Sequence, residues 1–212
     1  MLKATLDTVY SVNVDGLEFY FDSEYMDIGA NAEKIGLHNT IIFRPDEYEL
    51  HERQLLSYID PNSSVIELGA RIGFISCFTN RILNNKHKHV VVEVEDKWKK
   101  YLVCNKIKNK CHFKIEFGQM SDTKDLHYIH YPWRRPADLT LEQLQDKYEI
   151  VFDALVCDIE GGEYHLPENF FDSMKTIMIE LHRPLQKRDS FLISMRKWDL
   201  VKSLDTCHVF KR

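Results

Sequence analysis

The stretch that most constrains the fold is the run Val-Ile-Glu-Leu-Gly-Ala-Arg-Ile-Gly-Phe-Ile-Ser at residues 65–76. It has the pattern of an apolar strand that breaks at Gly69 and continues into a helix. Glycine allows the tight turn that such a break needs, and the start of a helix attracts polar or anionic groups. Strand, glycine turn and helix in this order are typical of α/β folds that bind an adenosine-bearing ligand beyond the carboxyl ends of their strands.

The spacing of the glycines narrows the choice of ligand. A nicotinamide fingerprint requires glycine at the first, third and sixth places of the turn, and these places hold Gly69, Arg71 and Phe74. Two of the three places fail. The form Glu-x-Gly-x-x-x-Gly, from Glu67 to Gly73, instead resembles the first motif of S-adenosylmethionine-dependent methyltransferases.

Composition predicts one globular domain that spans residues 1–212. A chain of 212 residues with 44% hydrophobic and 29% charged residues has enough apolar surface for one buried core. The net charge of −5 and the lack of a long basic run argue against nucleic acid as a partner. No signal peptide or membrane-spanning run is evident, so we expect a cytoplasmic protein with no membrane partner. The five cysteines form no C-x-x-C pair, which suits reduced thiols.

The order of hydrophobic patterns predicts a β-rich N-terminal lead-in at 1–44 and a Rossmann-like core at 45–212. Alternation at 9–14 and 17–21 around Asp15-Gly16 indicates a β-hairpin, residues 27–39 read as a loop, and 40–43 as a short strand. Alternating strands and helices then predict a mostly parallel sheet with helices on both faces. Helices are expected at 46–59, 73–85, 96–109 and 139–147, strands at 65–68, 89–94, 112–117, 151–158 and 176–182, and a helix with one short final strand after 191.

Ionisable residues lie at the ends of three of the expected strands. Glu93 ends the second strand of the core, where a carboxylate can accept the hydroxyl protons of an adenosine ribose, and its neighbour Glu95 is a competitor for that role. Asp158 and Glu160 end a later strand, where they can converge on a hydroxyl or on a metal ion, or else belong to a capped turn. His182 ends the next strand, so we expect it near Asp158, where it can accept a proton or bind a metal.

With these stretches in their order, the chain resembles the FkbM family of S-adenosylmethionine-dependent O-methyltransferases from about Tyr48 to Pro184. Members of this kind occur in bacteria and in large DNA viruses. The residues that carry the resemblance are 65–76, Val90–Glu93 with Leu102 and Asn105, Gly118–Asp122, Thr140–Leu144, Asp158–Glu163 and Glu180–His182. The distance in sequence from Glu93 to Leu102 and Asn105 fits the family better than the distance from Glu95, which selects Glu93 as the ribose ligand.

The resemblance implies a class I methyltransferase fold and a set of site residues. It implies a sugar or glycan hydroxyl as acceptor, and possible assistance from Mg²⁺ or Mn²⁺ bound by Asp158 and His182. Asp158, Glu160 and His182 would be catalytic, and the cofactor S-adenosylmethionine would contact Glu67, Gly69, Ala70, Arg71, Gly73, Glu93, Met120 and Ser121. A binding module without catalysis, or a methyltransferase with another acceptor, is the alternative.

Three positions depart from the family pattern. Glu67 stands where aspartate is commoner, which preserves the charge. Arg71 stands where a small or amide residue is usual, and its bulk can reshape the methionine end of the pocket. Val156 replaces a lysine two places before Asp158. If that lysine assists catalysis in the family, another group must act here, which favours His182 or a metal ion.

Overall fold

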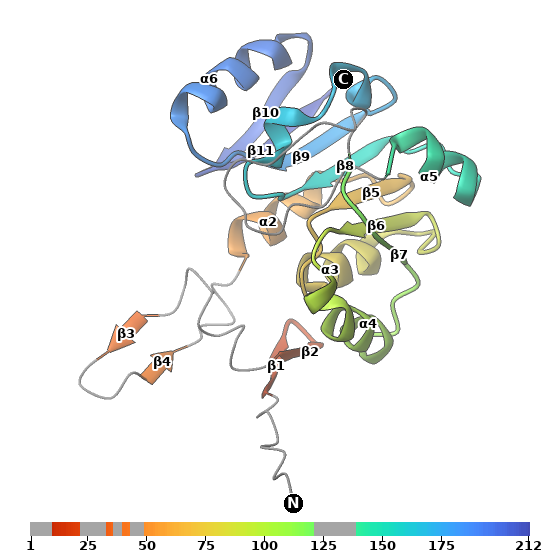
Figure 1. Ribbon diagram of the computed structural model, residues 1–212, viewed down its shortest axis with the longest axis vertical. Coiled ribbons are helices and arrows are strands. Elements are labelled where there is room, and N and C mark those ends of the chain that lie inside the picture. The colour runs from red at the N-terminus through yellow and green to blue at the C-terminus, as the bar shows by residue number, and fades with distance from the viewer. Residues whose placement is uncertain (1–9, 22–32, 36–39, 43–48, 121–138) are drawn as a thin grey trace, which may run out of the picture.

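The computed structural model describes residues 10–21, 33–35, 40–42, 49–120 and 139–212. Within these residues the centre is a seven-stranded sheet in the order β10-β11-β9-β8-β5-β6-β7 (Figure 1). Its strands are β5 (Val65–Leu68), β6 (His89–Glu93), β7 (Lys114–Phe117), β8 (Ala154–Cys157), β9 (Thr176–Glu180), β10 (Asp199–Leu204) and β11 (Cys207–Lys211).

The sheet is mostly parallel, as expected. β5 pairs in parallel with β6 and β8, β6 with β7, and β8 with β9, whereas β11 is antiparallel to both β9 and β10. Every residue of β5, β6 and β8 is buried. Strands that are covered on both faces need apolar side chains on both, which explains the continuous Val, Ile and Leu runs from which they were predicted.

Helices cover both faces of the sheet. One face packs its Val65, Val91 and Val156 side chains under α2, α3 and α4, and the other packs Ile66 and Leu155 under α5 and α6. The helices are α2 (Leu50–Leu55), α3 (Phe74–Ile82), α4 (Lys99–Lys108), α5 (Leu141–Tyr148) and α6 (Leu185–Ser194), with 3-10 turns at Leu56–Tyr58, Asp96–Trp98, Gly162–His165, Glu168–Phe171 and Met195–Lys197. The prediction of a mostly parallel sheet with helices on both faces is confirmed.

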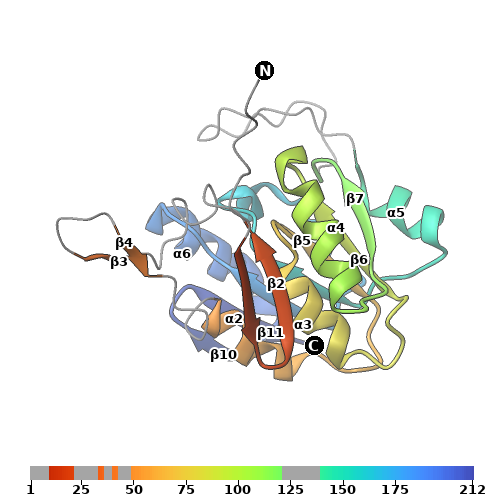
Figure 2. The same cartoon turned by 90° about the horizontal axis from the view of Figure 1, so that it is seen from below.

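The N-terminal hairpin packs on the first of these faces. β1 (Tyr10–Val14) and β2 (Leu17–Phe21) are antiparallel and lie beside α3 and α4 (Figure 2). Phe19 is fully buried, with its ring 4.4 Å from that of Phe74 and 5.9 Å from that of Phe78. The hairpin therefore shares the core of the parallel sheet.

Two asparagines, Asn105 on α4 and Asn109 at its C-cap, bind the outer edge of β2. The Asn105 side chain accepts a hydrogen bond from the backbone N–H of Tyr20 at 2.7 Å and donates to the carbonyls of Tyr20 and Ile72. One turn later, Asn109 bonds the N–H and the carbonyl of Glu18, both at 2.8 Å. A hairpin edge with unpaired backbone groups is thus satisfied by side chains instead of by a third strand.

The structure differs from the expected elements at three places. A short strand, β3 (Glu33–Ile35), lies inside the expected loop and pairs with β4 (Thr40–Ile42). The expected helix at 46–59 is α-helical only from Leu50, and its residues 46–48 lie outside the described part. The C-terminal segment forms a two-stranded hairpin instead of one strand. In the turn of this hairpin, Asp205 adopts the left-handed conformation at φ 52. The turn contains no glycine, the residue from which a hairpin could have been predicted.

In the part of the chain that the structure describes, every helix is too short or too polar to cross a membrane.

Candidate active site

The candidate site lies where the strand order of the sheet reverses. β5 has β6 on one side and β8 on the other, so the turns that follow β5 and β8 diverge at the carboxyl edge of the sheet. Ligands of open α/β sheets bind at such a point. A cleft enclosing about 530 Å³, part of it open to solvent, is lined there by the glycine turn and by the ends of β8 and β9.

Steric contacts explain why two positions of the turn, 69 and 73, hold glycine. Gly69 has φ +88, and a Cβ atom on it would lie 1.6 Å from the backbone oxygen of Asp158. Gly73 has φ +83, and its Cβ would lie 2.6 Å from Cδ1 of Leu102. Glycine at these positions therefore lets the turn after β5 approach both the end of β8 and α4.

Glu93 holds the glycine turn in shape. Its carboxylate accepts hydrogen bonds from the backbone N–H of Arg71 at 2.5 Å and of Glu95 at 2.7 Å. Burial raises the pKa of the Glu93 carboxyl, although these two hydrogen bonds oppose the rise. Its competitor Glu95 instead forms an ion pair with Lys97. A carboxylate has about four lone-pair sites, so these backbone bonds do not exclude a ligand hydroxyl, and the ribose role of Glu93 stays a prediction.

The other predicted cofactor residues are distributed around the same turn. Ala70 is buried on the wall of the cleft, and Arg71 has φ 49 with its guanidinium carbon 5.5 Å from the Trp98 ring centroid. Met120 is buried and forms an isolated bridge with Leu139. Ser121 lies outside the described residues.

Glu67 is anchored inside the protein. One of its carboxylate oxygens accepts a hydrogen bond from the Ser76 hydroxyl, and the other lies 3.1 Å from Nε2 of His89. All three side chains are buried. Glu67 thus ties β5 to α3 and β6, and its contact with a cofactor stays a prediction.

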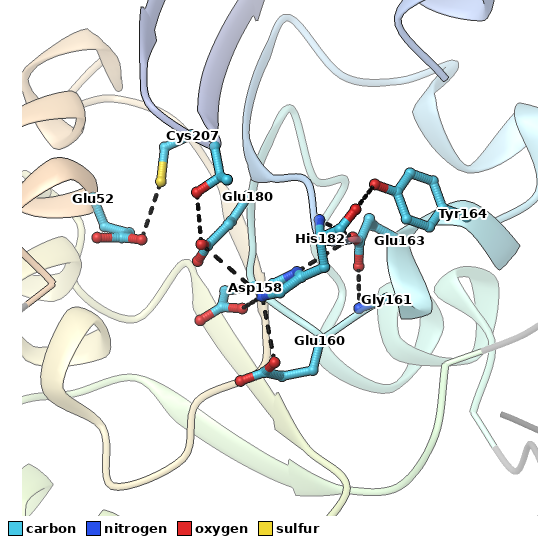
Figure 3. A network of polar contacts seen from close by, with 10 residues as sticks. Glu52, Asp158, Glu160, Gly161, Glu163, Tyr164, Glu180, His182 and Cys207 are labelled. Atoms are coloured by element: carbon cyan, nitrogen blue, oxygen red, sulfur yellow. Dashed lines mark hydrogen bonds and ion pairs between the residues drawn. The ribbon is translucent and has the colours of Figure 1, made fainter. Parts of the chain in front are cut away.

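His182 lies between several carboxylates beyond the ends of β8 and β9 (Figure 3). Its Nε2 atom is 3.5 Å from Oδ1 of Asp158, 3.4 Å from Oε2 of Glu160 and 4.0 Å from Oε1 of Glu180. The structure therefore brings Asp158, Glu160 and His182 together, as the topology predicted.

Glu163 orients this histidine from the opposite side. It is fully buried, and its Oε1 accepts a hydrogen bond from the His182 backbone N–H at 2.8 Å and lies 3.3 Å from Nδ1. Its Oε2 accepts from the N–H of Gly161, and the Tyr164 hydroxyl donates to the His182 carbonyl. The sequence analysis missed this role, although Glu163 closes the Asp158–Glu163 motif.

The charges of the cluster shift the pKa of its members. Burial would lower the pKa of His182, but the hydrogen bond with Glu163 and the charges of Asp158, Glu163 and Glu180 raise it to about 9. Burial and the repulsion from Glu180 raise the pKa of Asp158 well above its ordinary value, against the attraction of His182. At neutral pH we therefore expect His182 to be an imidazolium.

Asp158 presents an unsatisfied oxygen. Its side chain is 33% exposed, but the Oδ1 atom is buried and has no hydrogen-bond partner among the residues that the structure describes. A buried carboxylate oxygen without a hydrogen bond carries a desolvation cost, although here Nε2 of His182 lies 3.5 Å away. A ligand hydroxyl or a cation at this position would relieve that cost.

Among the residues that the structure describes, two groups of side chains have the composition of metal ligands. One is the predicted group of Asp158, Glu160 and His182, whose ligand atoms lie within 4.8 Å of one another. The other, which was not predicted, consists of Glu52, Glu180 and Cys207 on the cleft wall. These three come from α2, β9 and β11, and no sequence motif links them.

Val156, at the position where the resemblance to the FkbM family implied a lysine, is part of the hydrophobic core. It is 4% exposed and packs in the cluster under α2, α3 and α4. No charged group from β8 replaces the missing lysine at this position.

A comparison with protein families and one with curated proteins each found no match to this sequence. Solved structures do match. The tRNA m1G37 methyltransferase of M. jannaschii aligns with a TM-score of 0.55 at 11% identity and covers 97% of this chain and 57% of its own. The chain thus spans little more than half the length of that enzyme.

Two further structures contain a cofactor or its product. TYW2 of P. horikoshii, in complex with MeSAdo, has a TM-score of 0.56 at 15% identity over 97% of this chain and 70% of its own. The O-methyltransferase of Bacillus cereus, in complex with SAH, has a TM-score of 0.53 at 10% identity over 89% of this chain and 86% of its own. The chain described here therefore has the Rossmann-like fold of these three structures, two of which are methyltransferases by name.

Proposed function

We propose that this protein is an S-adenosylmethionine-dependent O-methyltransferase. The observation that carries the proposal is that the glycine turn after β5 and the unsatisfied Asp158 oxygen after β8 lie on one cleft at the switch point of the sheet. The first provides a binding surface for an adenosine ligand, and the second a proton acceptor beside it.

The cofactor would occupy the glycine turn. Gly69 and Ala70, which line the cleft, would form its backbone surface, and Glu93 would accept the ribose hydroxyls while it holds the N–H of Arg71. S-adenosylmethionine supplies an electrophilic methyl group on a cationic sulfonium. The carboxylates of Asp158 and Glu180 line the same cleft, and their negative charge suits a cation there.

The residues after β8 and β9 would receive the acceptor. When the acceptor oxygen takes the methyl group, the carbon–sulfur bond of the sulfonium would break to leave a neutral thioether, and the hydroxyl proton would pass to the Asp158 carboxylate, whose raised pKa makes it a better base near neutral pH. His182, held by Glu163, already carries a proton and acts as the cationic partner of Asp158 and Glu160. Positioning is the main task of these groups.

A divalent metal ion would fit the same group. Asp158, Glu160 and His182 offer two carboxylates and an imidazole, and the orphan Asp158 Oδ1 is available. Mg²⁺ and Mn²⁺ bind carboxylates, and either ion would lower the proton affinity of a bound hydroxyl. His182 would have to release its proton to bind the metal.

The resemblance to the FkbM family supports a sugar or glycan hydroxyl as the acceptor class. The test is methyl transfer from labelled cofactor by the full chain to a panel of glycans, with and without divalent metal, after cofactor binding has been measured by calorimetry. Methyl transfer to a glycan would support the proposal. Transfer that continues in the presence of a chelator would show that the reaction needs no metal ion. Cofactor binding without transfer to any acceptor would favour a binding module, and absence of binding would overturn the proposal.

A further inference from the structure

Two thiols far apart in the sequence meet between α3 and α4. Cys77 lies on α3 and is fully buried, whereas Cys111 follows α4 and is half-buried. Both contact Asn109. Its Nδ2 donates to the Cys77 sulfur at 3.7 Å, and its carbonyl accepts from the Cys111 sulfur at 3.6 Å. Both sulfurs thus contact the same asparagine, and each thiol shifts the pKa of the other.

The end of α4 explains why Cys111 reaches α3. Lys110 adopts the left-handed conformation at φ 53, and its N–H donates to the carbonyl of Ile107 at 3.1 Å. The N–H of Cys111 then donates to the carbonyl of Lys106 at 2.9 Å. This is a Schellman motif, which folds the chain back across the helix end. It directs Cys111 toward the buried Cys77.

The surroundings make the two thiols unequal. The neighbouring Cys77 thiol lowers the pKa of Cys111, burial opposes this, and the charges of Lys86 and Lys106 lower it further. The neighbouring Cys111 thiol and burial raise the pKa of Cys77. Lys86 and Lys106 form no ion pair with any residue in the described part of the chain, although the Lys106 ammonium lies 5.5 Å from the centroid of the Phe113 ring. A thiolate near two cations and a second thiol has the usual environment of a reactive cysteine.

We propose that Cys111 and Cys77 form a redox-sensitive pair, in which a peroxide oxidises Cys111 and Cys77 then closes a disulfide between α3 and the α4–β7 connection. This site is independent of the proposed methyl transfer.

The chemistry balances with one peroxide molecule. The Cys111 thiolate attacks one peroxide oxygen, the O–O bond breaks, and a sulfenic acid forms as hydroxide leaves and takes up a proton to become water. The Cys77 sulfur then attacks the sulfenic sulfur, the S–O bond breaks, and a second water leaves with the thiol proton. Two thiols are oxidised to one disulfide, and the peroxide is reduced to two waters.

The test uses the reduced full chain and a small excess of hydrogen peroxide. Intact mass should fall by the mass of two hydrogen atoms, and peptide mapping should find Cys77 joined to Cys111. The Cys111→Ser variant should lose this product entirely. The Cys77→Ser variant should instead accumulate a sulfenic acid at Cys111, which dimedone traps.

Cys104 provides the matched control because it is exposed on α4 and takes no part in the pair. Cys104→Ser should form the disulfide at the wild-type rate, and Lys86→Gln with Lys106→Gln should slow it several-fold. Each variant is first checked for a wild-type thermal transition. In the wild-type protein, oxidation of Cys104 ahead of Cys111, or a stable sulfenic acid at Cys111 without disulfide, would overturn the proposal whether or not the variants fold.

Discussion

The buried carboxylate of Glu163 contacts both the backbone and the ring of His182. Its Oε1 atom accepts a hydrogen bond from the His182 backbone N–H at 2.8 Å and lies 3.3 Å from the ring Nδ1. Glu163 therefore sets both the position and the charge of a histidine that three other carboxylates approach from the far side.

Replacing that carboxylate by an amide should separate position from charge. In Glu163→Gln the amide oxygen can still accept the N–H of His182, but the negative charge is lost. The pKa of His182 should fall from about 9 toward its ordinary value. Histidine NMR titration measures this, with His182→Gln to assign the signal. Glu116→Gln, which removes a charge on β7 paired with Lys147, should leave the pKa unchanged. A wild-type His182 that titrates near pH 6.5 contradicts the arrangement.

Substitutions of Asp158 and of Glu93 should have different effects on turnover and on cofactor affinity. Asp158→Asn removes the proposed proton acceptor, and we expect turnover to fall by about 10²-fold or more with little change in cofactor affinity. Glu93→Gln can accept only one of the two backbone N–H groups that Glu93 binds, and it weakens the acceptor for ribose hydroxyls, so cofactor affinity should fall by roughly tenfold or more. Calorimetry and single-turnover kinetics distinguish the two. Equal effects of both variants on cofactor affinity would show that the two roles are not separate.

The close approach at Gly69 predicts a large cost for one methyl group. In Gly69→Ala the new Cβ would overlap the Asp158 carbonyl, and the alanine would also occupy a left-handed conformation at φ +88. We expect the free energy of unfolding to fall by more than about 3 kcal/mol. Gly16→Ala is the control, because Gly16 has φ +81 but nothing within 4 Å of its Cβ position. Its cost should be the backbone term alone, about 1 kcal/mol. Similar costs in denaturant unfolding would disprove the steric argument.

Substitution of Asn105 should lower the free energy of unfolding far more than the same substitution of Asn109, one turn later. It is fully buried, and its side-chain NH₂ donates to the carbonyls of Tyr20 and Ile72. Asn105→Asp loses both donations and buries a charge, so we expect a loss of about 3 kcal/mol or more in unfolding free energy. Asn109→Asp, at a part-buried position, should cost clearly less. The comparison needs only chemical denaturation of the two variants.

The buried imidazole of His208 should make the free energy of unfolding depend on pH in the acid range. It lies on β11, buried, with Nδ1 2.8 Å from the Ser203 hydroxyl, and burial lowers its pKa to about 4. Because the unfolded chain binds this proton more tightly, stability should fall as pH drops from about 6.5 to about 4, by up to about 3 kcal/mol. His208→Gln should reduce that slope. An unchanged slope between wild type and variant in urea unfolding would refute the assignment.

The central strands could be predicted because burial on both faces imposes continuous apolar runs, as at Val90–Val92. The meeting of Asp158 with His182 followed from topology, since parallel strands end at one edge. The roles of Glu52 and Cys207 on the cleft wall could not be predicted, because they depend on how α2 packs beside β11. Likewise, no local pattern reveals that Asn105 binds a hairpin 85 positions earlier in the chain.

The distance in sequence between β2 and the asparagines that bind its edge has a consequence for folding during translation. An isolated two-stranded hairpin is at best marginally stable in water. β1 and β2 leave the ribosome early, yet the side chains that satisfy the outer edge of β2 follow 85 and 91 positions later. A nascent chain stalled before α4 should therefore expose this edge to proteases and to chaperones, and release of α4 should protect it in a single step.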